Sequence, residues 1–403
     1  MTTEQRQPFT VLCLAGDVKG HRFMVECKRL GCRVLVLTRE ALANAEWPRE
    51  VIDDFFCMPS LTNRDHITSA VSYLTRNHRI DRIVPMDDFD VEIAATLREH
   101  LRIPGMGETT SRYFRDKLAM RMAIVENELR SPKFAPILSR ESISNFLSSV
   151  PPPWLLKPRS QAGAAGIKKI SNADEIWSML DNMGDEQSHY ILEEFLPGEI
   201  YHVDAITTGY NVLFAEVSRY VQPPLETIQT GGVFSTRIIH REHPDVQNLK
   251  ELNAHILRIL GFRQGITHTE FIKNQADGAF YFLETAARVG GAYIADVIEA
   301  ATGINLWVEW ARIETVDDPN KYLAPKTGNK YAGILLCLAR QEWPDTSAYN
   351  DPEVVFRVHK KYHAGLIVAS DNPKKVEQLI KAYMPRFERD FLAAGPQPEK
   401  IER

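Results

Sequence analysis

Residues 265–291 carry the stretch that decides the fold, GITHTEFIKNQADGAFYFLETAARVGG. Its pattern predicts one strand over 265–272 and a second over 279–288. The Asp277-Gly278 pair between them is a signal for the turn of a β-hairpin. The sequence therefore predicts two antiparallel strands that fold back on each other about residue 277.

Two carboxylates, Glu270 and Glu284, face each other if the hairpin folds about residue 277. Like charges opposite each other destabilise a sheet, so either water covers both or a cation lies between them. The apolar neighbours favour an interior position, where unpaired carboxylates are costly. One or two carboxylates plus substrate phosphates are the usual ligands of Mg²⁺. Arg288, on the face of Glu284, offers a planar fork for an anionic intermediate.

Composition restricts the class of protein. The chain has 403 residues, 44% of them hydrophobic, which allows two or three domains with a sizeable core. Its net charge of −5 gives no reason to expect a nucleic acid as partner. The first ten residues lack the apolar run of a signal peptide, and no segment approaches a membrane span, so we expect a cytoplasmic protein. The five scattered cysteines, without a C-x-x-C pair, indicate reduced thiols.

The first hundred residues predict a small α/β unit. Strand, glycine turn, helix and strand follow one another, which is a βαβ opening. The expected elements lie at 10–15, 21–30, 33–37, 82–85 and 91–100. The turn lacks a full G-x-G-x-x-G fingerprint, so Gly16 and Gly20 indicate a tight turn rather than a dinucleotide site. Pro104 and Gly105 mark the link out of the unit.

A loop of small residues, SQAGAAG at 160–166, follows the expected strand at 154–157. Without bulky side chains its backbone N–H groups can close on a phosphate, although such loops are also common without a ligand. It does not match a Walker loop. Lys157, at the end of the strand, favours the phosphate interpretation. Lys117 lies in a charged helical segment at 111–126, which alone would indicate a solvated helix face.

The segment HYILEEFLPGEIYHVD, at 189–204, predicts two strands joined by a bend. Glu193 and Glu194 end the first strand, where a carboxylate and backbone groups could read the edge of an adenine. An acidic strand end before a turn explains the pair equally well. His202 alternates with Val203, and a lone histidine in such a strand is more often structural.

Together these stretches resemble the ATP-grasp superfamily over nearly the whole chain. The resemblance lies in the order of the parts: a βαβ unit, the lysine of RDKLAMR, a lysine strand entering a glycine loop, a glutamate hinge and a carboxylate hairpin that ends in arginine. Within the superfamily the chain is similar to the carboxylate–amine ligases that join amino acids into dipeptides. The closer similarity rests on EEFLPGEIYHVDAI, GITHTEF, LETAARVGGAYI and HKKYHAGLIVA.

The resemblance implies an α/β chain of the α+β ATP-grasp type with three parts. These are an N-terminal βαβ domain over 1–105, an ATP-grasp domain over 106–316 with a lid subdomain at about 133–196, and a C-terminal α+β segment over 317–403. The implied activity uses ATP to convert a carboxylate into an acyl phosphate, which an amine attacks to give an amide, ADP and phosphate. The substrates would be small molecules, amino acids above all, and a homodimer is one assembly that the relatives suggest.

The resemblance also implies roles for individual residues. ATP would be bound with Mg²⁺, for which Mn²⁺ could substitute, and Arg288 would stabilise the acyl phosphate and the tetrahedral intermediate. Phosphate contacts are implied for Lys117, Lys157 and the lid loop with Ser160, Gly163 and Gly166. Adenine contacts are implied for Glu193, Glu194 and Leu196, a ribose or substrate contact for His202, and metal contacts for Glu270 and Glu284. Glu199 is also assigned to nucleotide binding, without a defined contact.

Two positions depart from the superfamily pattern. Ala286 replaces the asparagine of E-x-N-x-R, an additional metal ligand, and Ile200 stands where many relatives carry a carboxylate. Two other functions share the ATP residues: a biotin-carboxylase-like enzyme, and a nucleotide-binding module without turnover. Against the carboxylase, Val289-Gly290-Gly291 follows the arginine in place of the glutamine and glutamate-histidine typical of carboxylases. Ala286 is the feature that favours the binding module.

Overall fold

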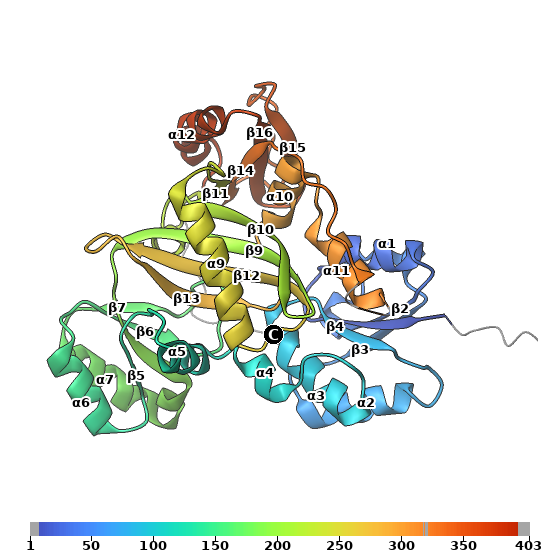
Figure 1. The fold of residues 1–403 in the computed structure, drawn as a ribbon, viewed down its shortest axis with the longest axis horizontal. Coiled ribbons are helices and arrows are strands. Elements are labelled where there is room, and N and C mark those ends of the chain that lie inside the picture. The colour runs from blue at the N-terminus through green and yellow to red at the C-terminus, as the bar shows by residue number, and fades with distance from the viewer. Residues whose placement is uncertain (1–7, 317, 319–320, 394–403) are drawn as a thin grey trace, which may run out of the picture.

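The computed structural model describes residues 8–316, 318 and 321–393. Its strands form three sheets, of four, eight and four strands (Figure 1). In this view the N-terminal domain lies at the lower right, the small third sheet at the lower left, and the eight-stranded sheet above both. This is the expected ATP-grasp arrangement, with a parallel N-terminal sheet and antiparallel sheets in the centre.

The N-terminal sheet is parallel, in the order β3-β2-β1-β4. All six residues of β1 are buried, because helices cover both faces of a parallel sheet. Its strands are β1 (Thr10–Ala15), β2 (Arg33–Arg39), β3 (Asp54–Met58) and β4 (Arg82–Pro85), and its helices are α1 (His21–Arg29), α2 (Arg64–Leu74) and α3 (Val91–Leu101). Gly20 precedes α1 at φ 80°, and a Cβ there would lie 2.3 Å from the sulfur of Met86, so the turn requires glycine.

The small antiparallel sheet lies within the range predicted for the lid subdomain. Its order is β5-β8-β6-β7, and α6 and α7 enclose a separate apolar core with it. The elements are β5 (Phe134–Pro136), α6 (Arg140–Ser149), β6 (Trp154–Pro158), β7 (Lys168–Ile170), α7 (Ala173–Met183) and β8 (Tyr190–Glu194). Two short helices, α4 (Glu108–Arg112) and α5 (Lys117–Glu126), connect the N-terminal domain to this subdomain.

The eight-stranded sheet has the order β13-β12-β9-β10-β11-β14-β16-β15. Its first part is β9 (Gly198–Thr208), β10 (Asn211–Tyr220), β11 (Phe234–Ile238), β12 (Gly265–Asn274) and β13 (Phe280–Ala286), with α8 (Pro224–Thr230) and α9 (Pro244–Ile259). The C-terminal segment adds β14 (Tyr331–Leu338), β15 (Val354–Arg357), β16 (His363–Ser370) and α12 (Pro373–Asp390). Because β14 pairs with β11, the C-terminal strands extend the central sheet.

Two further helices, α10 (Ile294–Thr302) and α11 (Leu306–Thr315), follow the hairpin. Residues of α10 and α11 share one apolar cluster with residues of β1, β2 and α1, so the N-terminal domain packs on these two helices. Residues 219–236 contain the end of β10, all of α8 and the start of β11. Glycine and proline pairs there mark the turns between elements.

The decisive hairpin forms with the predicted pairing of Glu270 with Glu284. The register shifts beyond this pair, where Phe271 pairs with Phe282, so Leu283 is the extra residue of a bulge. The second strand ends at Ala286, two residues before its predicted end. The chain leaves the sheet there, and Arg288 forms an ion pair with Asp88 of the N-terminal domain.

Candidate nucleotide and metal site

The two carboxylates of the hairpin have different protein partners. Lys117 Nζ lies 3.0 Å from Glu284 Oε2, and the Tyr220 hydroxyl donates to Glu270 Oε1 over 2.7 Å. The side chain of Glu284 is 33% exposed and that of Glu270 is 18% exposed. The pair is therefore neither fully solvated nor fully buried. They form an accessible pair of oxygen ligands held on adjacent strands.

The chemistry of this pair fits a divalent cation. Burial would raise the pKa of Glu270, but the neighbouring His268 and the hydrogen bond from Tyr220 lower it below its usual value. Glu270 is therefore a carboxylate at neutral pH, which is the form that binds a metal. Hard oxygen donors from one or two carboxylates, completed by phosphates, suit Mg²⁺. Ala286 pairs with His268 at the end of the same ladder and supplies no further oxygen ligand from its side chain.

Lys117 joins the carboxylate pair to the lid loop. It is the first residue of α5, whose N-cap Asp116 accepts a hydrogen bond from the backbone N–H of Leu118. Besides its contact with Glu284, Lys117 Nζ donates to the carbonyl oxygen of Gln161 over 2.7 Å. The lysine is only 7% exposed, so the fold holds its cation between the hairpin and the base of the loop.

The lid loop itself lies between β6 and β7. Gly163, Ala164 and Gly166 all have positive φ, at 62°, 56° and 72°. Arg115, a buried residue not identified from the sequence, donates to the carbonyl oxygen of Ser160 over 2.5 Å. Ser160, Gly163 and Gly166 are thus on one loop, anchored at its start.

Lys157 and Glu193 belong to a buried charge cluster. Glu193 is fully buried, with Lys157 Nζ at 2.6 Å and Arg121 Nε at 2.9 Å. Burial would raise the pKa of Glu193, but the two cations lower it to about 2. Because both ion pairs of its carboxylate are made within the protein, the geometry indicates that Glu193 positions Lys157. The adenine contact of Glu193 stays a prediction. Arg121 was not predicted, because only the fold brings α5 beside β8.

Beyond Glu193 the hinge leads into β9. Glu194 is half-buried and accepts a hydrogen bond from the backbone N–H of Lys133 over 3.2 Å, while Leu196 is half-buried in the bend. Glu199 is exposed and pairs with Arg219 and with the hydroxyl of Tyr201. The adenine and ribose roles implied for these residues remain predictions.

His202 is enclosed by protein side chains. It is completely buried, its Nδ1 is 2.7 Å from Asp204 Oδ2, and its Nε2 is 2.7 Å from Thr236 Oγ1. Burial lowers its pKa. With both ring nitrogens hydrogen-bonded inside the protein, the side chain has no free group for a substrate, and the structural interpretation describes it better.

Three residues beside the carboxylate pair were missed by the sequence analysis. Asp204 also accepts from His268, with 2.9 Å between Oδ1 and Nδ1, and Tyr220 lies against Glu270. Burial would lower the pKa of His268, but Asp204 and Glu270 raise it to about 10. A usable signal existed for His268, since a residue two positions before Glu270 in a strand shares its face.

Arg288 is fixed by the N-terminal domain. Its Nε donates to Asp88 Oδ2 over 2.7 Å, its Nη2 lies 2.6 Å from the same oxygen in an ion pair, and its Nη1 donates to the carbonyl oxygen of Val289. Burial would raise the pKa of Asp88, but Arg288 and Arg115 lower it. The two hydrogen bonds use two of the five guanidinium N–H groups. Nη2 takes part in the ion pair with Asp88, and no other described residue is bonded to the guanidinium.

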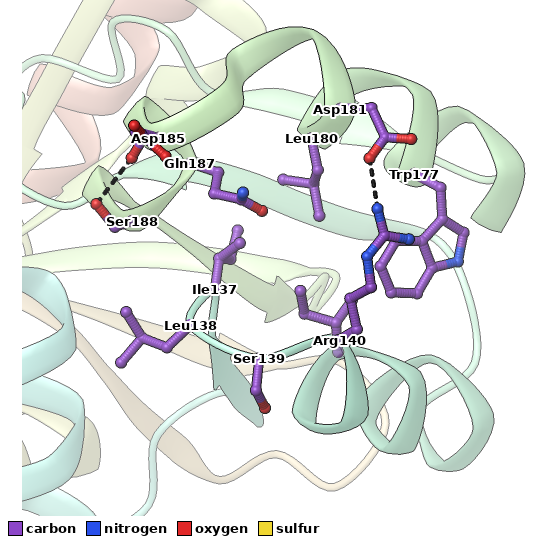
Figure 2. Close-up of a pocket in the computed structure, with 11 residues that line it drawn as sticks. Ile137, Leu138, Ser139, Arg140, Trp177, Leu180, Asp181, Asp185, Gln187 and Ser188 are labelled. Carbon is purple, nitrogen blue, oxygen red and sulfur yellow. Dashed lines mark hydrogen bonds and ion pairs between the residues drawn. The ribbon is translucent and has the colours of Figure 1, made fainter.

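A hollow of about 380 Å³ opens on the lid subdomain, away from these residues (Figure 2). It lies between the start of α6, the end of α7 and the turn that follows α7, and an ion pair between Arg140 and Asp181 crosses one side. Its lining comprises Ile137, Leu138, Ser139, Arg140, Ile143, Trp177, Leu180, Asp181, Asp185, Gln187 and Ser188. None of the predicted site residues lines it.

Comparison with known proteins places this geometry in a family. An ATP-grasp domain model matches residues 150–296, and an ATP-grasp N-terminal domain model matches residues 24–105. Over 303 residues the chain is 23% identical to an L-arginine-specific L-amino acid ligase of Bacillus subtilis, which covers 73% of this chain and 72% of the relative. No helix among the described residues has the length and apolar character needed to cross a membrane.

Solved structures agree on the fold. The L-amino acid ligase of Bacillus licheniformis superposes with a TM-score of 0.75 at 17% identity, covering 97% of this chain and all of that one. The biotin carboxylase domain of the Hydrogenobacter thermophilus 2-oxoglutarate carboxylase, solved with MgADP, gives 0.68 at 16% identity, with 96% and 92% covered. These matches agree with the parallel N-terminal sheet and with the carboxylate hairpin, and the chain belongs to the ATP-grasp superfamily.

Proposed function

We propose that this protein is an ATP-dependent ligase that joins the carboxylate of one amino acid to the amine of another, releasing ADP and phosphate. The observation that carries the proposal is the arrangement on the hairpin: Glu270 and Glu284 paired in register, Lys117 on Glu284, and Arg288 just beyond the strand. The amino-acid substrates are suggested by the Bacillus subtilis relative, an L-amino acid ligase.

In the first step the substrate carboxylate attacks the γ-phosphorus of ATP. A new P–O bond forms to the carboxylate oxygen, the bond to the β-phosphate oxygen breaks, and ADP leaves. In such transfers a protein mainly positions the groups and neutralises their charge. Lys117 and Lys157 supply positive charge and the 160–166 loop supplies backbone N–H groups, while Mg²⁺ at Glu270 and Glu284 would neutralise phosphate charge.

In the second step the amine attacks the carbonyl carbon of the acyl phosphate. The C–O bond to the phosphate then breaks, phosphate leaves, and the amine nitrogen gives up a proton to solvent. Negative charge develops on the carbonyl oxygen during the attack. The ion pair with Asp88 fixes one edge of the Arg288 guanidinium. The N–H groups that its hydrogen bonds leave free are therefore pre-oriented for that charge and need no further ordering.

The test is phosphate release by the purified protein with ATP, Mg²⁺ and pairwise mixtures of amino acids, with products weighed by mass spectrometry. Phosphate and a dipeptide mass in equal amounts are expected, and Glu284→Gln should abolish both. ADP formation that instead requires bicarbonate and biotin would identify the carboxylase reaction. ATP binding without turnover, across amino acids and other carboxylates, would refute the ligase proposal in favour of a binding module.

A further inference from the structure

The Tyr220 hydroxyl has a defined target. Tyr220 ends β10, is 6% exposed, and donates to Glu270 Oε1 over 2.7 Å. Its ring packs on the imidazole of His202 with 4.8 Å between centroids, and against Phe234 at 5.7 Å. These two ring contacts leave the hydroxyl few alternative positions, so residues of the sheet, and not of a loop, hold the hydrogen bond.

A buried carboxylate, Asp204, holds the two histidines that lie beside Tyr220. Asp204 is fully buried and accepts from His202 through Oδ2 and from His268 through Oδ1. Across the β12–β9 ladder His268 pairs with Asp204, and Glu270 pairs with His202. The other ring nitrogen of His268 lies 3.4 Å from the Tyr220 hydroxyl and 3.5 Å from Glu270 Oε1. The Tyr220 hydroxyl and His268 Nε2 therefore converge on one oxygen of Glu270, and Asp204 holds the other side of the His268 ring.

The cluster is better suited to support a ligand than to bind a metal itself. His202, Asp204 and His268 could offer three ligand atoms within 4.8 Å of one another. Both carboxylate oxygens of Asp204 and the Nδ1 atoms of both histidines already take part in hydrogen bonds between the three side chains, and all three residues are buried. The loop after Arg288 closes over them, since a Cβ on Gly290 would lie 2.8 Å from Asp204 Oδ1.

The consequence concerns the free oxygen of Glu270. Its Oε1 accepts from Tyr220 and faces His268, whereas Oε2 is bonded to none of the described residues. Because the hydrogen bond from Tyr220 fixes Oε1, the Glu270 carboxylate cannot rotate to present both oxygens to a cation. It therefore acts as a ligand through Oε2. Hydrogen-bonded partners of ligands commonly set metal affinity in this way.

We propose that Tyr220, supported by Asp204 and His268, is a positioning residue that holds Glu270 so that one oxygen faces the divalent cation of the bound nucleotide. The inference rests on the proposed function only in taking Glu270 and Glu284 as the ligands of that cation. It assigns a role to three buried residues that otherwise have no part in the reaction: Asp204 on β9, Tyr220 on β10 and His268 on β12.

Binding of Mn²⁺ in the presence of ADP tests this without any amide substrate. Free Mn²⁺ is followed by electron paramagnetic resonance, and ADP affinity is measured separately by calorimetry in EDTA. Tyr220→Phe removes the hydroxyl and keeps the ring, and should weaken Mn²⁺ binding to the ADP complex about tenfold. ADP affinity in EDTA should not change.

Tyr322→Phe is the matched control. Tyr322 is 7% exposed and donates to Glu309 Oε2 over 2.7 Å, so it loses the same kind of bond outside the site. It should leave Mn²⁺ affinity at the wild-type value. If Tyr220→Phe fails to fold, His268→Gln makes the same test, with weaker Mn²⁺ binding again expected.

Wild-type Mn²⁺ affinity in a folded Tyr220→Phe protein would overturn the inference. An equal loss in Tyr322→Phe would also overturn it, because the effect would then be a general one. A protein whose Mn²⁺ binding depends on Tyr220 but which forms no amide would refute the proposed function and leave this inference supported.

Discussion

Replacing Glu193 by glutamine should destabilise the lid subdomain strongly. Glu193 is fully buried between Arg121 and Lys157, so Glu193→Gln leaves two cations without their carboxylate. Its pKa falls from 4.5 to about 2, which at about 1.4 kcal/mol for each pKa unit corresponds to about 3 kcal/mol of stabilisation. Breaking one partner out of a buried ion pair costs about 3–5 kcal/mol, which agrees.

The assay is hydrogen exchange of the backbone amides of β6 and β8, the strands that carry Lys157 and Glu193. Their free energy of opening should fall by about 3 kcal/mol in Glu193→Gln. The neighbouring Glu194→Gln is the matched control, since Glu194 is half-buried and, among the described residues, its side chain accepts only from the backbone N–H of Lys133. Its effect should stay below about 1 kcal/mol. A change in Glu193→Gln no larger than in this control would refute the reasoning.

The same group predicts a dependence on pH. Because its folded pKa is lowered, Glu193 stabilises the protein fully above its unfolded pKa of 4.5, and this contribution disappears as pH falls toward 2. Wild-type protein should therefore lose stability over this window through Glu193, whereas Glu193→Gln lacks that part of the loss. Parallel stability–pH curves for the two proteins would contradict the assignment.

Further substitutions test the site residues. Arg288→Ala should lower the rate of phosphate release about a hundredfold, because an oriented donor at the developing charge is lost, while ADP affinity measured by calorimetry stays unchanged; a rate within about threefold of wild type would contradict its role. Asp88→Asn should lower the same rate less, about tenfold, because it releases Arg288 without removing it, and an unchanged rate would show that the ion pair is not needed. Lys117→Ala should weaken ADP binding with and without Mn²⁺, since it removes the cation between Glu284 and the lid loop; an unchanged affinity would exclude its phosphate contact.

Local patterns were enough to predict the hairpin. A turn signal and equal spacing gave the pairing of Glu270 with Glu284, because strand register follows directly from the position of the turn. The bulge at Leu283 shifts the register only on the turn side of this pair, so the prediction survived it. The end of the second strand was misjudged, since Arg288 is drawn out of the sheet by Asp88, a residue two hundred positions away.

Long-range partners explain the other differences. Nothing near Glu193 in sequence shows that Arg121 will occupy its carboxylate, and nothing near His202 shows that Thr236 will use its Nε2. Asp204, which uses Nδ1, lies only two residues along the same strand, but the sequence does not show that both side chains are buried. The resemblance to a family transfers the position of such residues but not their burial. Only the three-dimensional fold separates side chains that face the site from side chains that support it.

The central claim, transfer of a phosphoryl group to a carboxylate, can be tested with an isotope and without knowing the substrates. The protein is incubated with ATP, Mg²⁺ and a mixture of amino acids whose carboxyl oxygens are all ¹⁸O, and the released phosphate is analysed by mass spectrometry. An acyl phosphate keeps one carboxyl oxygen as its bridge, and that oxygen leaves with the phosphate when the amine attacks. The account predicts phosphate that carries one ¹⁸O atom; release of unlabelled phosphate would contradict it.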